Sequence, residues 1–420
     1  MVESLVPRFA LGRLELLVGA LRIVIVNGPR QAGKTTLLSM LREQRGGSFR
    51  SLDNDQTLAA ALADPREFAR YGDRPIVIDE VQRGGDSLIL AIKYLVDQDN
   101  SAGHFVLSGS TRFLTIPTLS ESLAGRAVFV ELWPLAVAER TAVDIDLAAV
   151  LFDSPHTLLA AAPSSWSRED YLRLLVEGGF PEVIRLPTTV RGAWFEGYLQ
   201  TVIQRDVRQF ADIRHASVVP QLLRLLAARA GSPVVAADLA RTVEMSQATI
   251  RDYLSYLNMV YLTIQLPAWS TSVSTKAAKV PKTFLADVGV AAHLLGVDAE
   301  QMREPGHKSA GVLLETFVVT ELIKLLAHQD RGLTVHYYRD RDGREIDIVV
   351  EGRDGRVVAI EVKATSSASS TDFRHLAWLR DKLGDRFAAG IVCNLGHESL
   401  PFGDRLMAVP VSALWQHARL

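Results

Sequence analysis

The segment 28–35 combines two glycines, a lysine and a hydroxyl residue at a spacing that suits phosphate chemistry. It reads Gly-Pro-Arg-Gln-Ala-Gly-Lys-Thr and fits the pattern G-x-x-x-x-G-K-[ST]. In such a loop, backbone N–H groups surround a phosphate chain, the lysine reaches the outer phosphates, and the hydroxyl is a ligand for Mg²⁺. We therefore predict that ATP and Mg²⁺ bind here, with Lys34 also catalytic and Thr35 also a metal ligand. The predicted nucleotide-binding residues of the loop are Gly28, Pro29, Arg30, Gln31, Ala32, Gly33, Lys34, Thr35 and Thr36.

Two neighbouring carboxylates, Asp79 and Glu80, follow the apolar run 76–78. Carboxylates at the carboxyl end of a buried strand lie where α/β sheets bind their ligands. In P-loop ATPases the aspartate of such a pair holds Mg²⁺ and the following glutamate orients the attacking water. We predict these roles for Asp79, a metal ligand, and Glu80, a catalytic residue. The alternative is a strand that ends in a solvated acidic turn.

A third apolar run, 105–107, ends in Ser108-Gly-Ser110. Ser108 or Ser110 would contact the γ-phosphate or the attacking water, and Ser108 is the predicted nucleotide contact; a simple strand-to-loop turn is the alternative. Arg112 and Arg126 are candidates for stabilising charge in the transition state of phosphoryl transfer, although surface arginines are common.

The last third of the chain holds a second set of acidic residues and a lysine. Glu315 lies in the apolar helical segment 311–322, Asp347 in the strand-like run 345–350, and Glu361 and Lys363 in the run 357–363. Whether Asp347 faces Glu361 depends on the turn between the two runs. A three-residue loop with Gly355 left-handed pairs residue 347 with 361, whereas a two-residue Asp-Gly turn shifts the pairing by one.

With the first register, a metal-dependent site is predicted in this part of the chain. Glu315, Asp347 and Glu361 would be oxygen ligands of Mg²⁺, and Lys363 would activate a water or stabilise charge on a phosphate, which makes it a predicted catalytic residue. Glu321, on the same helical segment, competes with Glu315 for its role. The alternative for the whole set is a charged edge of a sheet.

These residues require an α/β fold. Parallel strands are predicted at 23–26, 49–52, 75–79, 104–110 and 127–132, with helices at 8–21 and after residue 34. The chain has 420 residues, of which 48% are hydrophobic and 22% charged, so several globular domains are expected. Its net charge of −2 means that any contact with nucleic acid must come from a local patch.

The single cysteine, Cys393, excludes an internal disulfide and any multi-cysteine metal site, and fits a reducing cytoplasm. Charged residues interrupt the first 22 residues, so no export signal is expected, and no apolar run is long enough to span a bilayer. We expect a cytoplasmic protein that does not contact a membrane.

The middle of the chain is predicted to be helical. Helices are expected at 171–177 and 194–210, followed by three helices between residues 220 and 265. Of these three, residues 236–243 and 247–257, with Met245-Ser246 as the turn and cap, form a helix-turn-helix pattern. From residue 216 to 285 there are seven Arg or Lys against three Asp or Glu, which favours DNA. The residues predicted to face DNA are Gln247, Thr249, Arg251 and Ser255, with Lys276, Lys279 and Lys282 near a wing.

Four sequence motifs together carry a family resemblance: GPRQAGKTT, IDE followed by VQR, LSGST and GGFPE. They resemble the bacterial and archaeal AAA-type ATPases that carry a C-terminal domain of unknown function, and the D…E-x-K set is similar to the PD-(D/E)xK nuclease fold. The resemblance implies a P-loop ATPase core at 1–140, a helical lid at 141–215, a winged helix at 216–281 and a restriction-endonuclease-like α/β domain at 282–420. It also makes Arg205 a candidate sensor of the γ-phosphate, with a surface salt bridge as the alternative.

Two functions from different classes fit these features. The first is a Mg²⁺-dependent ATPase acting on DNA, with a metal-dependent nuclease domain. The second is an ATP-controlled switch whose nuclease-like domain is an inactive binding platform. A metabolic kinase would need neither the helix-turn-helix nor the nuclease-like segment. A homo-oligomer is possible under both readings, and neither identifies an arginine finger.

Overall fold

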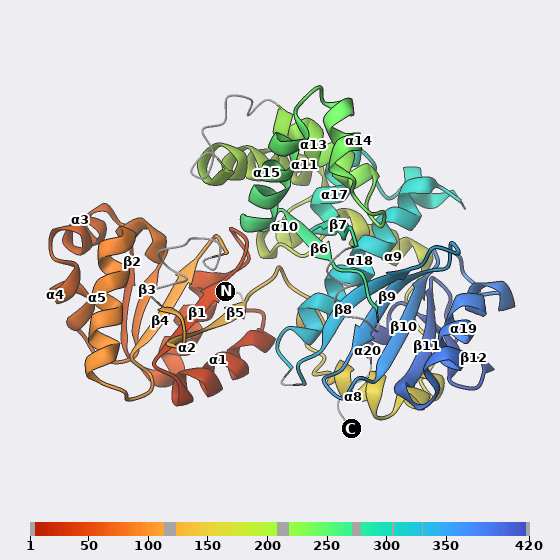
Figure 1. The fold of residues 1–420 in the computed structure, drawn as a ribbon, viewed down its shortest axis with the longest axis horizontal. Helices are drawn as coiled ribbons and strands as arrows, with labels where there is room; N and C mark the ends of the chain where they lie inside the picture. The colour runs from red at the N-terminus through yellow and green to blue at the C-terminus, as the bar shows by residue number, and fades with distance from the viewer. Residues whose placement is uncertain are drawn as a thin grey trace. The chain divides into compact units, whose positions relative to one another are not determined.

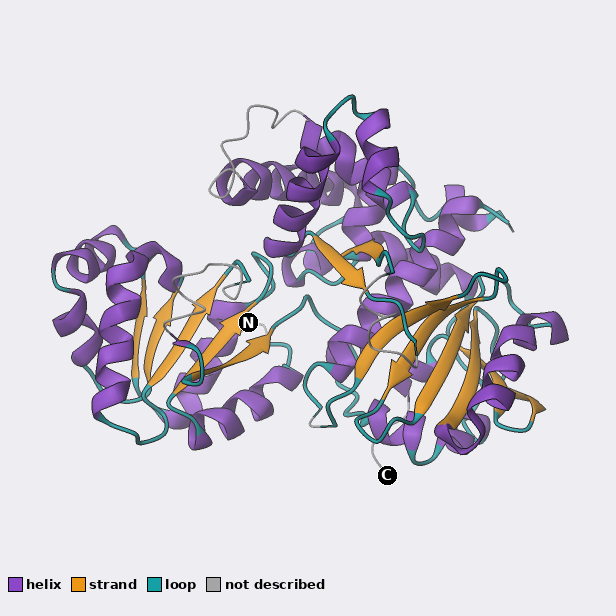
Figure 2. Cartoon of the chain, viewed as in Figure 1, coloured by secondary structure: helices purple, strands orange, loops and turns teal. Residues whose placement is uncertain are grey.

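The structure, a computed structural model, describes residues 5–112, 123–207, 218–270, 279–304, 306–329 and 331–416. The chain divides into two compact units, the first made of residues 1–135 and 259–261 and the second of residues 136–258 and 262–420. Figure 1 traces the chain through both units, and Figure 2 separates the helices from the strands. Among the described residues, no helix has the length and apolar character needed to cross a bilayer.

The first unit contains a five-stranded parallel sheet with the strand order β2-β3-β4-β1-β5. Its strands are β1 (Ile23–Asn27), β2 (Ser48–Ser51), β3 (Ile76–Asp79), β4 (Phe105–Gly109) and β5 (Ala127–Glu131). The prediction of an α/β fold with a parallel sheet is confirmed. The helices of this unit are α1 (Phe9–Ala20), α2 (Lys34–Arg45), α3 (Asp55–Ala63), α4 (Pro65–Arg70) and α5 (Gly85–Gln98), with the 3₁₀ turn η1 (Val81–Gly84).

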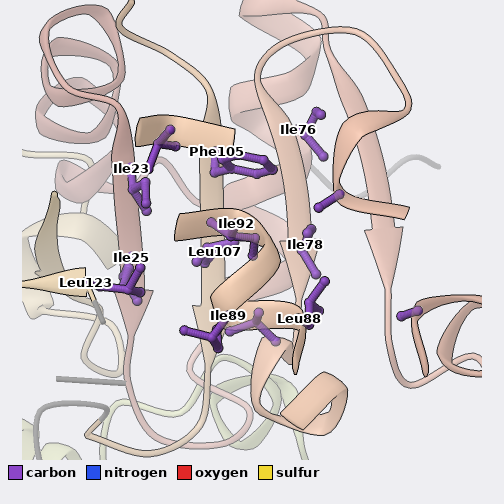
Figure 3. Close-up of a cluster of buried hydrophobic side chains, with 14 of the residues drawn as sticks. Ile23, Ile25, Ile76, Ile78, Leu88, Ile89, Ile92, Phe105, Leu107 and Leu123 are labelled. Atoms are coloured by element: carbon purple, nitrogen blue, oxygen red, sulfur yellow. The ribbon is translucent and has the colours of Figure 1, made fainter. Parts of the chain in front are cut away.

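Helices cover both faces of this sheet, which explains why its central strands are apolar at every position. In β1, Ile23 and Ile25 pack with α5 in one buried cluster, part of which is drawn in Figure 3. Val24 and Val26 belong to a second cluster that includes α1 and α2. Because successive side chains of a strand point to opposite faces, an unbroken apolar run indicates burial on both.

The end of β1 lies very close to the end of β5, and this closeness fixes the loop that follows. Leu132 N donates to Asn27 O at 2.7 Å. A Cβ at Gly28 would collide with Leu132 O. Glycine is therefore required where the chain leaves the sheet and turns toward α2.

The second unit contains a six-stranded mixed sheet with the order β12-β13-β11-β10-β9-β8. Strands β10, β11 and β13 run parallel, whereas β8, β9 and β12 are antiparallel to their neighbours. Helices α18 (Lys308–Leu326) and α8 (Leu147–Phe152) pack on β10, and α19 (Arg374–Leu383) packs on β9 and β11. The strands are β8 (Thr334–Arg339), β9 (Glu345–Glu351), β10 (Val357–Val362), β11 (Phe387–Asn394), β12 (Leu400–Gly403) and β13 (Leu406–Pro410).

The turn between β9 and β10 adopts the three-residue form. Gly352 N donates to Arg356 O at 2.9 Å, and Gly355 has a φ of 78°. The register pairs Glu351 with Val357 and continues to Ile348 with Ile360. Asp347 is therefore opposite Glu361, as the first of the two predicted registers requires.

The remaining part of the second unit is mostly helical. Its elements up to residue 259 are α7 (Val137–Arg140), η3 (Pro155–Leu159), α9 (Arg168–Glu177), α10 (Pro181–Arg185), α11 (Thr188–Thr201), the π-helix η4 (Val202–Val207), α13 (Val219–Ala228), α14 (Ala236–Thr242) and α15 (Gln247–Met259). Next come the antiparallel pair β6 (Thr263–Leu266) and β7 (Lys282–Leu285), then α17 (Val288–Leu295), η6 (Gln301–Arg303), η7 (Ser370–Phe373), η8 (Gly384–Arg386) and α20 (Ala413–Gln416). The predicted end of the helix 194–210 lies outside the described residues, as does Lys276.

The glycines of the GGFPE motif lie against the buried carboxylate of Asp287. Asp287 caps α17 by accepting from Val290 N at 3.1 Å, and it also accepts from Gly179 N at 2.7 Å. A Cβ at Gly178, which has a φ of 69°, would collide with the Asp287 carboxylate. Burial raises the pKa of the Asp287 carboxyl group above its ordinary value, because the charged form loses its hydration. The backbone hydrogen bonds act in the opposite direction, because they favour the carboxylate. This motif joins α9 to α17 and has a structural role.

We predict that Gly28→Ala destabilises the first unit by about 1–3 kcal/mol, because the added methyl group forces the ends of β1 and β5 apart. Chemical denaturation followed by far-ultraviolet circular dichroism measures this. Gly12→Ala in α1 is the matched control, since a Cβ at Gly12 meets nothing within 4 Å. We expect this control to be neutral or stabilising by up to about 1 kcal/mol. Equal stability of the two variants would contradict the close approach at Gly28.

Candidate functional site

The predicted phosphate-binding loop lies between β1 and α2, at the carboxyl edge of the parallel sheet. Gly33 precedes the helix in a left-handed conformation, with a φ of 95°, and Gln31 has a φ of 60°. The Lys34 ammonium lies over the loop and donates to Gly28 O at 3.0 Å and to Pro29 O at 2.9 Å. These positions leave the first backbone N–H groups of α2 directed toward the loop, which is the arrangement that binds anions.

Arg8, which was not among the residues predicted from the sequence, holds this loop through hydrogen bonds to two backbone carbonyls. Its guanidinium is buried and donates to Ala32 O at 2.8 Å and to Trp133 O at 2.7 Å. A buried arginine with two carbonyl partners on different segments holds those segments at a fixed separation. The only sequence signal was its place just before the apolar stripe of α1, which is too weak to identify a partner 24 residues away.

Asp79 joins the phosphate-binding loop to the neighbouring strand. Its Oδ2 accepts from Thr35 Oγ1 at 2.8 Å, and its Oδ1 accepts from Ser108 Oγ. The three residues come from β3, α2 and β4, and Asp79 is buried. The predicted metal ligands Thr35 and Asp79 and the predicted contact Ser108 are therefore brought together.

Glu80 sits beside this group in a left-handed conformation, with a φ of 55°. Such a conformation costs about 1–2 kcal/mol for a residue with a Cβ, so the surroundings must hold it. Gln82 Nε2 donates to Glu80 Oε2 at 2.5 Å, and Ser110 Oγ reaches the same oxygen at 3.4 Å. Gln82 was known from the sequence only as part of the VQR motif, and its position shows that it orients the predicted catalytic glutamate.

The donor set at this edge fits ATP and Mg²⁺. Gly28 lets the loop begin directly against the end of β5, where a Cβ would collide with Leu132 O. The Thr35 hydroxyl and the Asp79 carboxylate are adjacent hard oxygen donors of the kind that Mg²⁺ prefers. Bound there, Mg²⁺ would supply positive charge to the phosphate oxygens. The Lys34 ammonium lies at the loop, and Glu80 directly follows Asp79 at the same strand end.

The two arginines proposed for transition-state charge have partners within the first unit. Arg126 pairs with Asp97, with Nε to Oδ1 at 2.6 Å and Nη2 to Oδ2 at 2.9 Å. Arg112 lies 3.6 Å from Glu131 and stacks over the Tyr261 ring at 4.7 Å. Both therefore have structural partners in this unit. Arg205 lies on the π-helix η4, and its sensing role stays a prediction.

The C-terminal acidic residues also come together, near the start of β9 and the end of β10, away from the turn that joins the two strands. Asp347 Oδ2 accepts from Val362 N at 2.9 Å, and Lys363 Nζ lies 2.9 Å from Glu361 Oε2. Glu315 on α18 faces this group, whereas Glu321 accepts from Val137 N at 2.8 Å and pairs with Lys324. Of the two glutamates of α18, Glu315 is therefore the one that lies at the cluster, and its role as a metal ligand stays a prediction.

Burial and mutual repulsion control the charge of these carboxyl groups. Burial, together with the nearby Asp347 carboxylate, raises the pKa of Glu315 to about 7 and that of Glu361 to about 8. For Lys363 the two effects oppose each other. Burial disfavours the charged ammonium, but the Glu361 carboxylate favours it, and the pKa of Lys363 lies above its ordinary value. The cluster therefore carries fewer negative charges at neutral pH than its number of carboxyl groups suggests.

Lys282 corrects one expectation from the sequence. It was expected near a wing, among residues facing DNA, but it lies buried on β7, with its Nζ 3.0 Å from Glu315 Oε1 and 2.9 Å from Glu345 Oε1. Neither Lys282 nor Glu345 was predicted to belong to the site. A lysine inside the apolar run 280–285 was the available signal, because lysine is buried only with a partner. Within the described ranges, no group of three or more His, Cys, Asp or Glu is arranged to hold a metal ion.

The predicted helix-turn-helix residues occupy two helices joined by a tight turn. Ser246 caps α15 by accepting from Thr249 N at 3.1 Å, and its hydroxyl lies 2.7 Å from Thr249 Oγ1. Gln247, Arg251 and Ser255 are exposed at four-residue intervals along α15. Thr249 is half-buried at the cap. Lys279 donates to Arg339 O at 2.6 Å.

Three segments of the chain match models of known protein families. Residues 21–141 match the AAA domain family, residues 168–301 match a domain of unknown function, DUF8612, and residues 310–414 match another, DUF4143. The first segment contains the phosphate-binding loop, Asp79, Glu80 and Ser108. The other two families bring no described activity.

Two mycobacterial proteins match this chain over nearly its whole length. The chain is 29% identical over 409 residues to the uncharacterized proteins Rv2008c of Mycobacterium tuberculosis and Mb2031c of Mycobacterium bovis, covering 97% of this chain and 84% of theirs. Among solved structures, it is similar to the Walker-type ATPase PABY2304 of Pyrococcus abyssi, at 15% identity and a TM-score of 0.41, covering 70% of this chain and 97% of that one. The match over residues 21–141 shows that this part of the chain is an AAA domain.

Proposed function

We propose that this protein is an ATP-controlled switch that acts with DNA, in which ATP hydrolysis in the first unit changes the state of α15. The chemistry begins at the AAA domain. Lys34 and the loop N–H groups would bind the phosphates of ATP, Thr35 and Asp79 would hold Mg²⁺, and Glu80 would orient the attacking water. Gln82 keeps the Glu80 carboxylate in place for this role.

The observation that carries the switch proposal is the segment after β4. Ser108 and Ser110 contact Asp79 and Glu80, and Arg112, two residues further on, holds the segment Met259–Tyr261. Arg112 N donates to Met259 O at 2.9 Å, and the guanidinium stacks on the Tyr261 ring. A change at the ATP site can therefore reach residues 259–261 through one short stretch of chain.

Tyr261 is held firmly in this unit. Its ring packs edge-on against Trp133 at 5.4 Å, and its hydroxyl donates to Glu131 at 3.3 Å. Its φ of 60° is unusual for a residue with a large side chain, so the surroundings determine this conformation. Because Met259 is the last residue of α15, any movement of the clamp made by Arg112, Glu131, Trp133 and Tyr261 would be passed directly to that helix.

DNA is the proposed partner of α15. The order of α13, α14 and α15, followed by the antiparallel strands β6 and β7, fits a helix-turn-helix with a wing. Gln247, Arg251 and Ser255 present amide, guanidinium and hydroxyl groups on one exposed face, and these groups recognise base edges and phosphates.

An active nuclease is the second candidate, because the β9–β10 register places Asp347 opposite Glu361 and next to Lys363. The order α18, β8, β9, β10, α19, β11 also fits the nuclease-like fold. The buried ammonium of Lys282 among these carboxylates favours the binding platform over the nuclease.

We predict that Glu80→Gln lowers the kcat of ATP hydrolysis about 100-fold or more while nucleotide binding persists, because the amide cannot accept a proton or orient water in the same way. Lys34→Ala should lose both binding and hydrolysis. A phosphate-release assay and a fluorescent ATP-binding assay measure the two effects. Glu67→Gln is the control, since Glu67 is exposed on α4. Normal hydrolysis by Glu80→Gln would remove this assignment.

We predict that Arg112→Met lowers kcat about fivefold or more with little change in KM, because the clamp positions the β4 end without touching ATP. In Glu80→Gln protein, hydrogen exchange of residues 247–259 should differ between the ATP-bound and nucleotide-free states. This difference should vanish when Arg112→Met is added. Arg126→Met is the matched control, because Arg126 also belongs to the first unit, directly before β5, but pairs with Asp97. An exchange difference that survives Arg112→Met would refute the switch proposal.

We predict that the wild-type protein leaves duplex and single-stranded DNA intact with Mg²⁺ or Mn²⁺, and that Lys363→Ala behaves identically. DNA should instead change the rate of ATP hydrolysis, and Arg251→Ala should weaken that response. Gel analysis of DNA and the phosphate-release assay measure these outcomes. Mn²⁺-dependent cleavage that disappears in Lys363→Ala would replace the binding platform with the nuclease.

A further inference from the structure

The C-terminal carboxylates surround a buried ammonium. The Lys282 side chain is 1% exposed, and its Nζ lies 3.0 Å from Glu315, 2.9 Å from Glu345 and 3.9 Å from Asp347. These three carboxylates come from α18 and β9, whereas Lys282 comes from β7, which lies outside the six-stranded sheet. The ammonium also lies 5.4 Å from the centre of the Tyr337 ring, whose face attracts cations.

Two further carboxylate oxygens of the cluster also have partners. Glu361 pairs with Lys363 at 2.9 Å, and the second oxygen of Asp347 accepts from Val362 N at 2.9 Å. All four carboxylates thus interact with an ammonium or a backbone N–H. Carboxylates that each have a cation or an N–H donor beside them do not need an added ion as a counter-charge.

This arrangement does not fit the divalent metal that a nuclease-like fold implies. Mg²⁺ requires oxygen ligands at about 2.0–2.1 Å in a nearly octahedral arrangement. In this cluster the Lys282 ammonium lies within hydrogen-bond distance of Glu315 and Glu345 and 3.9 Å from Asp347, so it occupies the place of a shared cation. A dication binding the same oxygens would also be repelled by the buried ammonium.

Two features of the surrounding chain keep Lys282 in this position. Strand β7 is fixed on one side by pairing with β6, where Leu266 faces Lys282, and on the other by a bridge to Pro233. Gly231, with a φ of 79°, leaves the space that the Glu315 carboxylate occupies, because a Cβ there would collide with it. The backbone therefore presents the ammonium and its acceptor to each other.

We propose that the Lys282 ammonium is the built-in counter-cation of this cluster, so that the carboxylates of the C-terminal sheet are neutralised by the protein itself and not by a divalent metal. The Lys282 ammonium on β7 thereby links Glu315 of α18 to Glu345 and Asp347 of β9. This role concerns the second unit alone and is independent of ATP hydrolysis.

The test removes the ammonium and asks whether a metal takes its place. Lys282→Ala leaves three carboxylates without their cation, and its Tm should fall by about 5–15 °C. Millimolar Mn²⁺, without nucleotide, should recover part of this loss in Lys282→Ala and leave the wild-type Tm unchanged. Lys282→Ala combined with Glu315→Gln should recover stability without metal, since the double variant has one charge fewer to neutralise. Lys308→Ala, an exposed lysine at the start of α18, is the matched control and should stay within about 2 °C of wild type.

A wild-type Tm for Lys282→Ala would overturn the proposal. If Lys282→Ala does not fold, calorimetric titration of nucleotide-free wild type with Mn²⁺ decides the question. The isotherm should be the same for wild type and Glu361→Gln, because the cluster binds no Mn²⁺. A binding site that is present in wild type and lost in Glu361→Gln would equally overturn the proposal.

Discussion

One buried carboxylate, that of Asp79, fixes the geometry of the ATPase unit. Its two oxygens accept from Thr35 at the start of α2 and from Ser108 at the end of β4. This is possible because β3 lies beside β4, and β4 beside β1, so that three chain segments reach the same edge of the parallel sheet. A carboxylate this deeply buried would be costly without its donors, so the positions of the loop and of the β4 end depend on each other.

The features that could be predicted from the sequence are the local ones. The P-loop spacing, the unbroken apolar strands and the acidic strand end each lie within a few residues, and the sheet follows from them. The β9–β10 register could be narrowed to two choices because Gly355 can adopt a positive φ, and the structure has one of these two. Ser246 could be identified as a cap because serine before a helical pattern accepts from the first turn.

What the sequence did not reveal are contacts between segments far apart in the chain. Arg8 donates a hydrogen bond to a carbonyl oxygen 125 residues away, and Lys282 pairs with a glutamate 33 residues away. Charged residues near an apolar run read equally well as exposed or as buried with a partner, and only the fold supplies the partner. The same limit explains Arg112: an arginine after a strand end looks like a free cation in the sequence, whereas in the structure it stacks on Tyr261.

The two buried lysines of the proposed sites differ in the kind of acceptor that they contact, and this difference bears on what each can do. Lys34 donates to the backbone carbonyls of Gly28 and Pro29, which are neutral acceptors. A charged phosphate oxygen is an acceptor about twice as strong, so exchanging a carbonyl for phosphate is favourable. Lys282, itself buried, already contacts charged carboxylates, so a neutral ligand would be a weaker partner for its ammonium. The lysine of the AAA domain is thus placed to change partners during a reaction cycle, while Lys282 is placed to keep its own. Under these proposals, chemistry that depends on the nucleotide belongs to the first unit, and the Lys282 contacts have a constant structural role in the second unit.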